Sequence, residues 1–292
     1  AAAALLALDR FVLKLAYVVH AAVHAESNPT GTLSSMVYMA YNQRSLFVTG
    51  VWTTIQLALA GTAIAFVLSL LMVFLRIQEP DKRDNDFVKF LKIVANKFSR
   101  FYIFVIRGTP MMVQSLIFYY AIFNLFKRTG MSVTEINRVW SLFISGLVTV
   151  SLNSTAYLAE VLRGGILAVD AGQMEAARSL GMTHWQAMRK VVFPQAIKNS
   201  LPAIGNEFII NIKDSSVLCV VGVSDLMFMT RSVAGIYYKG TECYLIAATV
   251  YLFLTYLSSL LLKAITGRMT APDNTKRRQG NQTVDLGLPS SN

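Results

Sequence analysis

The chain has 292 residues, of which 54% are hydrophobic and only 15% are charged. Its mean hydropathy of +0.48 is too apolar for a soluble domain of this length and indicates an integral membrane protein. The formal net charge of +11 could suggest nucleic-acid binding, but basic residues beside apolar spans are what membrane orientation requires, so we exclude a nucleic-acid partner.

Residues 1–25 are apolar, but the run is interrupted by Asp9, Arg10 and Lys14. A secretory signal peptide, a short extra membrane-spanning helix and an interfacial helix all agree with this pattern, and we favour an extra N-terminal helix. His20 and His24 are spaced for one helix face, but no third ligand lies nearby, so we predict no metal site. Residues 26–43 have the Asn, Pro and Gly content of a linker. We therefore treat residues 1–44 as an N-terminal extension.

Five apolar stretches follow, and we predict that each crosses the membrane as a helix. They cover residues 45–75, 101–126, 139–159, 199–223 and 243–262. The first contains no charged residue and is long enough to cross with tilt. In the second, Pro110 interrupts helical hydrogen bonding, so we expect a kink there. The fourth should begin irregularly at Pro202 and Gly205, and the polar connections at 127–138 and 224–242 are predicted to be loops.

Basic residues are unequally divided between the two sides of the membrane. Seven Lys and Arg lie at residues 76–100, five at 163–198 and five from residue 263 onward, which makes seventeen on one side against six on the other. Loops rich in Lys and Arg stay in the cytoplasm, so we place the side with seventeen there. The C-terminus is then cytoplasmic, and the polar residues 268–292 are expected to form a disordered cytoplasmic tail.

Polar side chains within or beside the predicted spans are candidates for a translocation path. They are Arg107, Thr109, Asn153, Ser154, Tyr157, Glu160, Glu207, Asn211, Lys213 and Asp214. Polar groups at membrane depth are costly unless they face protein or water, so they either pack helices together or line the path. Arg107 has the alternative of reaching to the cytoplasmic headgroups. Glu160 and Arg163 form an i, i+3 pair where the third span ends.

The fourth predicted span carries a specific polar pattern. Glu207, Asn211 and Asp214 recur at i, i+4 and i+7, so they share one face of a helix. Two alternatives remain for this face. It either forms an ion pair with Lys213 within the membrane or lines the path with polar groups.

Residues 170–194, DAGQMEAARSLGMTHWQAMRKVVFP, form a polar or weakly apolar stretch between two spans. Asp170 is an N-cap for a first short helix, and Gly181 suits the left-handed position that ends it. Thr183 begins a capping box for a second helix, which Pro194 closes or redirects. We call this helix-Gly-helix unit the 170–194 module.

Within the module, Glu175, Ala176 and Ala177, followed by Gly181 and by VVFP at residues 191–194, resemble the EAA loop of ABC importer permeases. In that family the loop is cytoplasmic and docks as a coupling helix on a separate ATP-hydrolysing subunit. The resemblance implies this coupling role for Glu175, Ala176, Ala177 and Gly181. Their chemistry fits, since the alanines permit close approach, the carboxylate can meet basic groups and the glycine permits the turn. An ordinary amphipathic surface helix is the alternative.

Three further segments resemble the polar amino-acid subfamily of these permeases. They are RGTPMMVQ from residue 107, SLNSTAYLAEVLRGGI from residue 151 and IKDSS from residue 212. The resemblance covers residues 45–267 and implies an all-α integral membrane protein. The implied fold is a five-helix type I ABC importer permease core with a cytoplasmic EAA coupling helix, preceded here by the extra N-terminal helix. The implied location is the bacterial cytoplasmic (inner) membrane, with several passes.

The function implied by the resemblance is the translocation of polar amino acids. The implied partners are a pair of ATP-binding subunits, a second permease that is identical or homologous, an extracytoplasmic substrate-binding protein and the lipid bilayer. The chain has no GxxxxGK[ST] loop, so we predict that it is not an enzyme and binds no cofactor, and that ATP and Mg are held by the partner ATPase. The rival function is a self-sufficient secondary transporter or channel with ion sites at Glu207 and Asp214. Such a protein would have no use for the 170–194 module.

Overall fold

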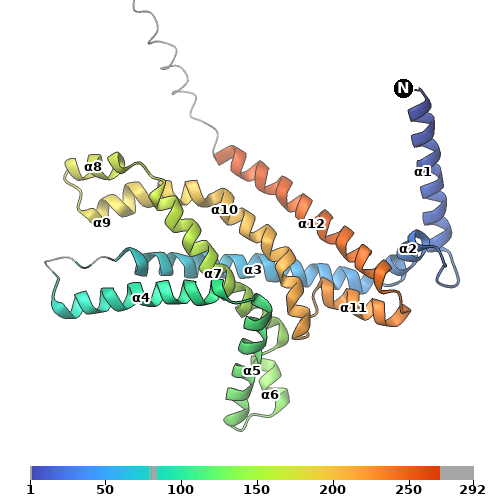
Figure 1. Cartoon of the computed structure of the whole chain (residues 1–292), viewed down its shortest axis with the longest axis horizontal. Helices are drawn as coiled ribbons and strands as arrows, with labels where there is room; N and C mark the ends of the chain where they lie inside the picture. The colour runs from blue at the N-terminus through green and yellow to red at the C-terminus, as the bar shows by residue number, and fades with distance from the viewer. Residues whose placement is uncertain (1, 79, 81–83, 270–292) are drawn as a thin grey trace, which may run out of the picture.

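The computed structural model describes residues 2–78, 80 and 84–269, and this part of the chain is helical without strands, as the predicted all-α class requires (Figure 1). The first helices are α1 (Ala2–Val23), α2 (Thr32–Asn42), α3 (Arg44–Ile77), α4 (Asp86–Gly108), α5 (Met111–Arg128) and α6 (Val133–Val139). They are followed by α7 (Leu142–Leu167), α8 (Ala171–Ser179), α9 (His184–Ala187), a π-helical segment (Met188–Val192), α10 (Phe193–Asp214), a 3-10 segment (Ser215–Val220), α11 (Leu226–Tyr237) and α12 (Gly240–Met269). Residues 270–292, which make up most of the predicted tail, lie outside the described residues.

In the described residues, α3, α7 and α12 are each long and apolar enough to cross a membrane, while α4 and α5 meet the same criterion only as a bent pair. The predicted first, third and fifth spans are therefore confirmed. Helices α3 and α12 extend beyond both predicted ends, whereas α7 begins later than predicted and extends beyond its predicted end. Figure 1 shows α8 and α9 at one end of the long helix α3, and α2 and α11 at its other end. The bundle thus has two distinct ends, and the 170–194 module occupies one of them.

The second predicted span is not a single helix. The chain forms α4 and α5, whose axes differ by 111°. Thr109 is extended, with φ −123° and ψ 144°, because the ring of Pro110 disfavours helical backbone in the residue before it. The expected kink at Pro110 is confirmed, and it is sharp enough that α4 and α5 meet the criterion for a span only as a bent pair. The predicted fourth span differs as well, since α10 runs regularly through Pro202 and the irregular part is the 3-10 segment after Asp214.

Pro194 neither closes nor redirects the second helix of the 170–194 module. It occupies the first turn of α10, where its missing N–H would have no intrahelical partner in any case. The residues on both sides of the π-helical segment, Ala187 and Phe193, keep right-handed helical dihedral angles. The module therefore continues into α10 without a turn.

The stretches predicted as a linker and as polar loops contain the short helices α2, α6 and α11. Side-chain caps explain two of them. The hydroxyl and backbone N–H of Ser132 both donate to the Glu135 carboxylate at 2.8 Å, which holds the pKa of Glu135 below its usual range and starts α6. The Asp225 carboxylate accepts from Phe228 N at 2.9 Å and starts α11. The polar composition of these stretches therefore did not reveal that helices begin within them.

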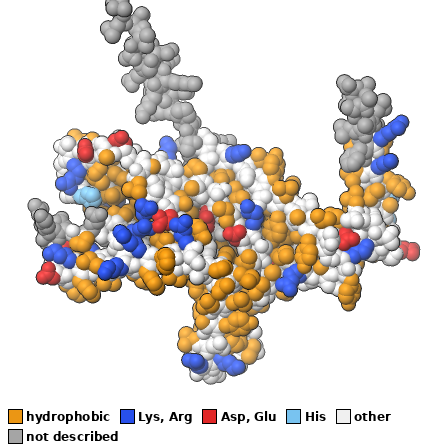
Figure 2. Space-filling view, viewed as in Figure 1, with side chains coloured by type: hydrophobic (Ala, Val, Ile, Leu, Met, Phe, Trp, Pro, Cys, Tyr) orange, Lys and Arg blue, Asp and Glu red, His pale blue; other side chains and the backbone are white. Residues whose placement is uncertain are grey.

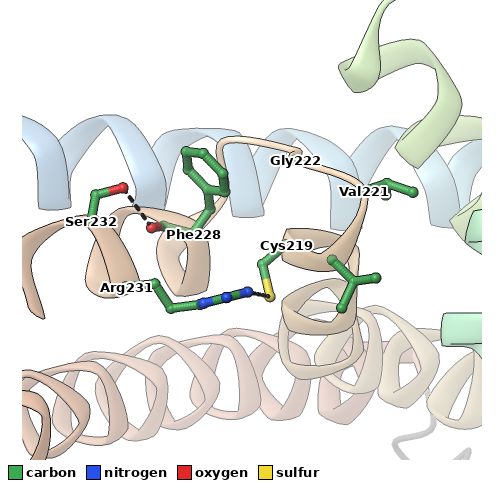
Figure 3. Close-up of a pocket in the computed structure, with 7 residues that line it drawn as sticks. Cys219, Val221, Gly222, Phe228, Arg231 and Ser232 are labelled. Carbon is green, nitrogen blue, oxygen red and sulfur yellow. Dashed lines mark hydrogen bonds between the residues drawn. The ribbon is translucent and has the colours of Figure 1, made fainter. Parts of the chain in front are cut away.

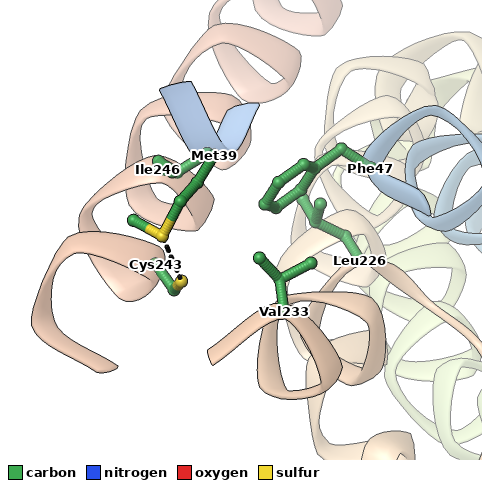
Figure 4. Close-up of a cluster of buried hydrophobic side chains, with 6 residues drawn as sticks. All are labelled: Met39, Phe47, Leu226, Val233, Cys243 and Ile246. Atoms are coloured by element: carbon green, nitrogen blue, oxygen red, sulfur yellow. Dashed lines mark hydrogen bonds between the residues drawn. The ribbon is translucent and has the colours of Figure 1, made fainter. Parts of the chain in front are cut away.

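The N-terminal extension is packed against the bundle through α2. Figure 4 shows the apolar cluster where α2, α3, α11 and α12 meet. Its members are Met39, Phe47, Leu226, Val233, Cys243 and Ile246. Lys239, just before α12, donates to the Pro29 carbonyl at 2.8 Å and to the Ser35 hydroxyl at 3.0 Å. These contacts fix α2 to the end of the bundle opposite the 170–194 module.

Candidate functional site

The local structure of the 170–194 module follows its sequence signals. The Asp170 carboxylate accepts from Gly172 N at 2.7 Å and caps α8. Gly181 has φ +83°, a left-handed conformation that ends the helix and that side chains with a Cβ avoid. Thr183 and Gln186 form both bonds of a capping box, at 2.9 and 3.2 Å. The predicted helix-Gly-helix unit is confirmed.

The outer surface of the module is exposed. Glu175 and Ala176 are exposed, while Ala177 is buried beneath them. Leu180, beside the turn, is 81% exposed, which is unusual for a large apolar side chain that has a bundle nearby to pack against. Next to it lies a shallow hollow of about 460 Å³ lined by Arg178, Gly181, Met182 and Thr183. This surface combines a carboxylate, small residues and an apolar side chain, as a docking surface for another protein would.

The module is joined to the bundle by few side chains. The Gln195 side chain of α10 donates to the Gln173 side chain of α8 at 3.2 Å. The ring of Trp185 in α9 lies edge-on to the ring of Phe74 in α3, with 5.7 Å between their centroids. The module is therefore held at the end of the bundle while its other face remains free.

Asn153, Ser154 and Asn211 are buried and hydrogen-bonded across helices. Asn153 donates to Gln114 of α5 at 2.9 Å, and Gln114 in turn donates to the Ile106 carbonyl of α4 at 2.7 Å. These bonds connect α7 to the bend between α4 and α5. Thr109, another path candidate, accepts from the same Gln114 amide at 2.8 Å. Sequence reasoning did not single out Gln114, although a Gln within an apolar run is the signal for such a role.

A second buried network joins the three central helices. The Ser154 hydroxyl of α7 donates to Asn211 of α10 at 2.9 Å, and the Asn211 amide donates to Thr62 of α3 at 2.8 Å. Of the two alternatives for Ser154 and Asn211, the arrangement favours helix packing, because their polar atoms are occupied by neighbouring helices. Thr62 was also missed from sequence, since threonine is common in apolar helices.

Glu160 is the centre of an ion-pair cluster. Its carboxylate pairs with Arg76 of α3 and with Arg163 Nε at 3.0 Å, which confirms the i, i+3 pair and adds a partner that sequence spacing could not reveal. The Arg76 carbonyl also accepts from the Asn96 side chain of α4 at 2.8 Å. The cluster therefore ties α3, α4 and α7 together, and Glu160 is engaged in structure rather than free beside a path.

Glu160→Gln should lower the stability of the chain in detergent by about 1–2 kcal/mol, measured by thermal denaturation. The change leaves Arg76 and Arg163 without a carboxylate, and the partial exposure of the cluster keeps the loss below the roughly 3–5 kcal/mol of a fully buried pair. Asp86→Asn is the matched control, because its side chain is 99% exposed and its pair with Lys89 contributes little. Equal stabilities for Glu160→Gln and the wild type would contradict the role of the cluster.

The remaining path candidates divide between buried and exposed positions. Glu207 is buried at 7% exposure, whereas Lys213 and Asp214 are exposed. Among the described residues no ion pair joins Lys213 to either carboxylate, so the ion-pair alternative is not supported. Asp214 is the last residue of α10, and it is the following 3-10 segment that turns inward, with Ser215 and Leu218 buried.

Arg107 and Tyr157 form a pair of contacting side chains on the surface. The Arg107 guanidinium lies over the Tyr157 ring at 5.2 Å from its centroid, and both side chains are exposed. Figure 2 shows acidic and basic side chains gathered across the middle of the visible face, between apolar areas. Charged groups at membrane depth do not face lipid without a large penalty, so exposed charged side chains on the spans are expected to face protein or water.

A hollow near α11 is lined by none of the predicted site residues. It has a volume of about 440 Å³ and lies where the 3-10 segment turns into α11 (Figure 3). Arg231 points to Cys219, with 3.8 Å between Nη1 and Sγ. Cys219 and Ser232 lie in the lining, but no described base or carboxylate is placed to activate them, so we assign the hollow no chemistry.

Comparison with known proteins adds to this geometry. Residues 89–271 match the family described as "Binding-protein-dependent transport system inner membrane component". The glutamine transport system permease protein GlnP of Escherichia coli (strain K12) is 31% identical over 77% of this chain and 93% of its own length. The probable amino-acid permease protein YxeN of Bacillus subtilis (strain 168) is 36% identical over 62% of this chain and 78% of its own. A solved structure of an amino acid ABC transporter with histidines has a TM-score of 0.65 at 38% identity, covering 78% of this chain and 95% of that chain.

Proposed function

The chain belongs to the family of binding-protein-dependent transport system inner membrane components, and from this premise we propose how its site residues serve transport. Like its relatives, it is the membrane-spanning permease subunit of an amino-acid ABC transporter, and its substrates are polar amino acids. The observation that carries the coupling mechanism is the exposed 170–194 module at one end of an apolar bundle. A self-sufficient secondary transporter would not need this surface.

The 170–194 module is the coupling element. Glu175, Ala176 and Gly181 contact a groove on a separate ATPase subunit in the cytoplasm, so this end of the bundle lies inside the cell, whereas Ala177 is buried and does not reach the groove. ATP and Mg are bound and used on that partner, and this chain contributes no catalytic group. Exposed Glu175 supplies the charge for the contact, and exposed Ala176 lets the backbone of α8 approach closely, while buried Ala177 packs α8 within the module. Closure of two ATPase subunits then moves the module and, through it, the spans.

Four exposed polar side chains, which we call the polar band, face the translocation path. Arg107, Tyr157, Lys213 and Asp214 are exposed on this chain, and a second permease, identical or homologous, would cover them and enclose the path between the two subunits. Buried Glu207 precedes Lys213 and Asp214 by more than one turn of α10. A zwitterionic amino acid needs groups of both signs along its route, and this band supplies them.

The domain division follows from these roles. Residues 45–267 form the permease domain, and residues 1–44 form an extension that α2 fixes to the extracytoplasmic end. Residues 268–292 form a cytoplasmic tail. An extracytoplasmic binding protein delivers the amino acid at the end where α2 and α11 lie, and the whole assembly resides in the bacterial cytoplasmic membrane.

Lys213→Gln and Asp214→Asn should each lower amino-acid uptake about tenfold or more while leaving the assembly intact, because they remove charge from the path rather than from the packed core. The measurement is uptake into proteoliposomes that contain the complete transporter. Lys127→Gln, at an exposed position in the last turn of α5, is the control and should transport at the wild-type rate. Wild-type uptake by both path variants would remove Lys213 and Asp214 from the path.

Reconstitution also tests the function itself. Proteoliposomes with the ATPase and the binding protein should accumulate a polar amino acid only when ATP is supplied to the ATPase. Uptake by this chain alone, driven by an ion gradient and abolished by Glu207→Gln, would instead support the secondary transporter. An amino-acid panel under the first condition identifies the substrate.

A further inference from the structure

An aromatic contact joins the 170–194 module to helix α3. Trp185 of α9 packs against Phe74 of α3, with their rings inclined at 74° and their centroids 5.7 Å apart. Both side chains remain partly open, with Trp185 53% and Phe74 43% exposed, so the pair lies at the surface and outside the apolar core. An edge-to-face arrangement of this kind adds favourable electrostatic energy to the apolar contact.

The pair connects the module to α3, a helix that does not adjoin the module along the chain. The module enters from α7 and leaves into α10, and the Gln173–Gln195 bond also leads to α10. Between α9 and α10 lies the π-helical segment Met188–Val192, whose wider turn is a local departure from regular α-helix of the kind that often occurs at functional sites. A rotation of the module could be absorbed at this segment before it reached the body of α10.

The helix that Phe74 belongs to is connected to the rest of the bundle at the same level. The adjacent Val73 is buried in the apolar cluster shared with α4 and α7. Ser99 of α4 donates to the Met72 carbonyl at 3.0 Å, and Arg76 forms its ion pair with Glu160 of α7. A displacement of α3 at Phe74 is therefore passed directly to α4 and α7.

We propose that Trp185 and Phe74 are positioning residues that transmit motion of the 170–194 module to α3, in parallel with the backbone route through the π-helical segment into α10. This inference rests on the proposed docking of the module on an ATPase subunit. The aromatic contact links the module to α3 directly, while the π-helical segment connects α9 to α10 along the backbone. With both routes in place, α3 and α10 would move together.

The test is the ratio of amino acid imported to ATP hydrolysed, in proteoliposomes with the complete transporter and its binding protein. The probe is a uniformly radiolabelled amino-acid mixture, so no single substrate has to be known. Trp185→Ala and Phe74→Ala should each lower this ratio about two- to tenfold, the range that one aromatic pair supplies. The ratio for the double variant should be no lower than that of the more strongly affected single variant, because both changes remove the same contact.

Two further variants separate this role from general damage. Trp185→Phe keeps an aromatic ring against Phe74 and should restore most of the ratio. Leu71→Ala, at an exposed position on α3 near Phe74 and outside the module, should leave the ratio unchanged. All variants should retain the ATPase subunit on purification, since the contact lies between parts of one chain.

Three results would overturn the inference. A wild-type ratio for Phe74→Ala would show that α3 is not reached through this contact. Additive losses in the double variant would show that the two rings act separately. Loss of the ATPase subunit from Trp185→Ala would make Trp185 a docking residue instead. The proposed docking function is tested separately by Glu175→Lys, because the effect of that variant on coupling does not depend on Trp185.

Discussion

Replacing Glu175 with Lys, or Gly181 with Val, is expected to abolish coupled amino-acid uptake while the chain still folds and reaches the membrane. Glu175 is exposed on α8, so reversing its charge acts on the partner's groove rather than on the bundle. Gly181 has φ +83°, which a β-branched side chain adopts at a cost of about 1–3 kcal/mol. The strain should tilt α9 away from its docking position. When ATP hydrolysis and uptake are measured together in proteoliposomes, either hydrolysis should continue without uptake or both should stop.

The chain offers a matched control for each change. Gly130, in the turn between α5 and α6, has φ +87° and no atoms within 4 Å of an added Cβ, so Gly130→Val carries the same backbone strain away from the module. Glu26→Lys reverses an exposed charge in the N-terminal extension. Both controls should remain coupled. Coupled uptake by Glu175→Lys and Gly181→Val would show that the module does not dock.

Gly165→Val is expected to prevent stable folding, with a loss of at least about 3 kcal/mol. A Cβ at Gly165 would lie 2.7 Å from the Ala196 carbonyl oxygen and would also clash with the Ser200 hydroxyl, so α7 and α10 could not keep their close approach. Gly164→Val is the control, because a Cβ there meets nothing within 4 Å and the change in helix propensity is the same. Yield and thermal denaturation in detergent measure both variants. Similar stabilities would contradict the packing of α7 on α10.

The 170–194 module could be predicted from sequence because its structure is determined locally. Asp170, Gly181 and Thr183 each act on atoms within three residues along the chain, so their signals can be read from a short window. The same holds for the bend at Pro110. The angle of 111° between α4 and α5 could not be read in this way, because it depends on how both helices pack on α7.

The site within the membrane was less predictable because its contacts join distant parts of the chain. Glu160 meets Arg76 across 84 residues, and Ser154 meets Asn211 across 57 residues. Helical periodicity identified the polar faces but not their partners. It also could not show that Asp214 ends its helix at the surface of this chain.

Site-specific photo-crosslinking in intact membranes tests the coupling claim most directly. A photoreactive phenylalanine analogue would replace Leu180, which is 81% exposed beside the turn of the module, or Tyr238, which is 93% exposed at the opposite end after α11. The predicted result is that Leu180 crosslinks to the ATPase subunit, identified by mass spectrometry, and that Tyr238 does not. A crosslink to the ATPase from Tyr238 but not from Leu180 would reverse the orientation and contradict the docking role of the 170–194 module.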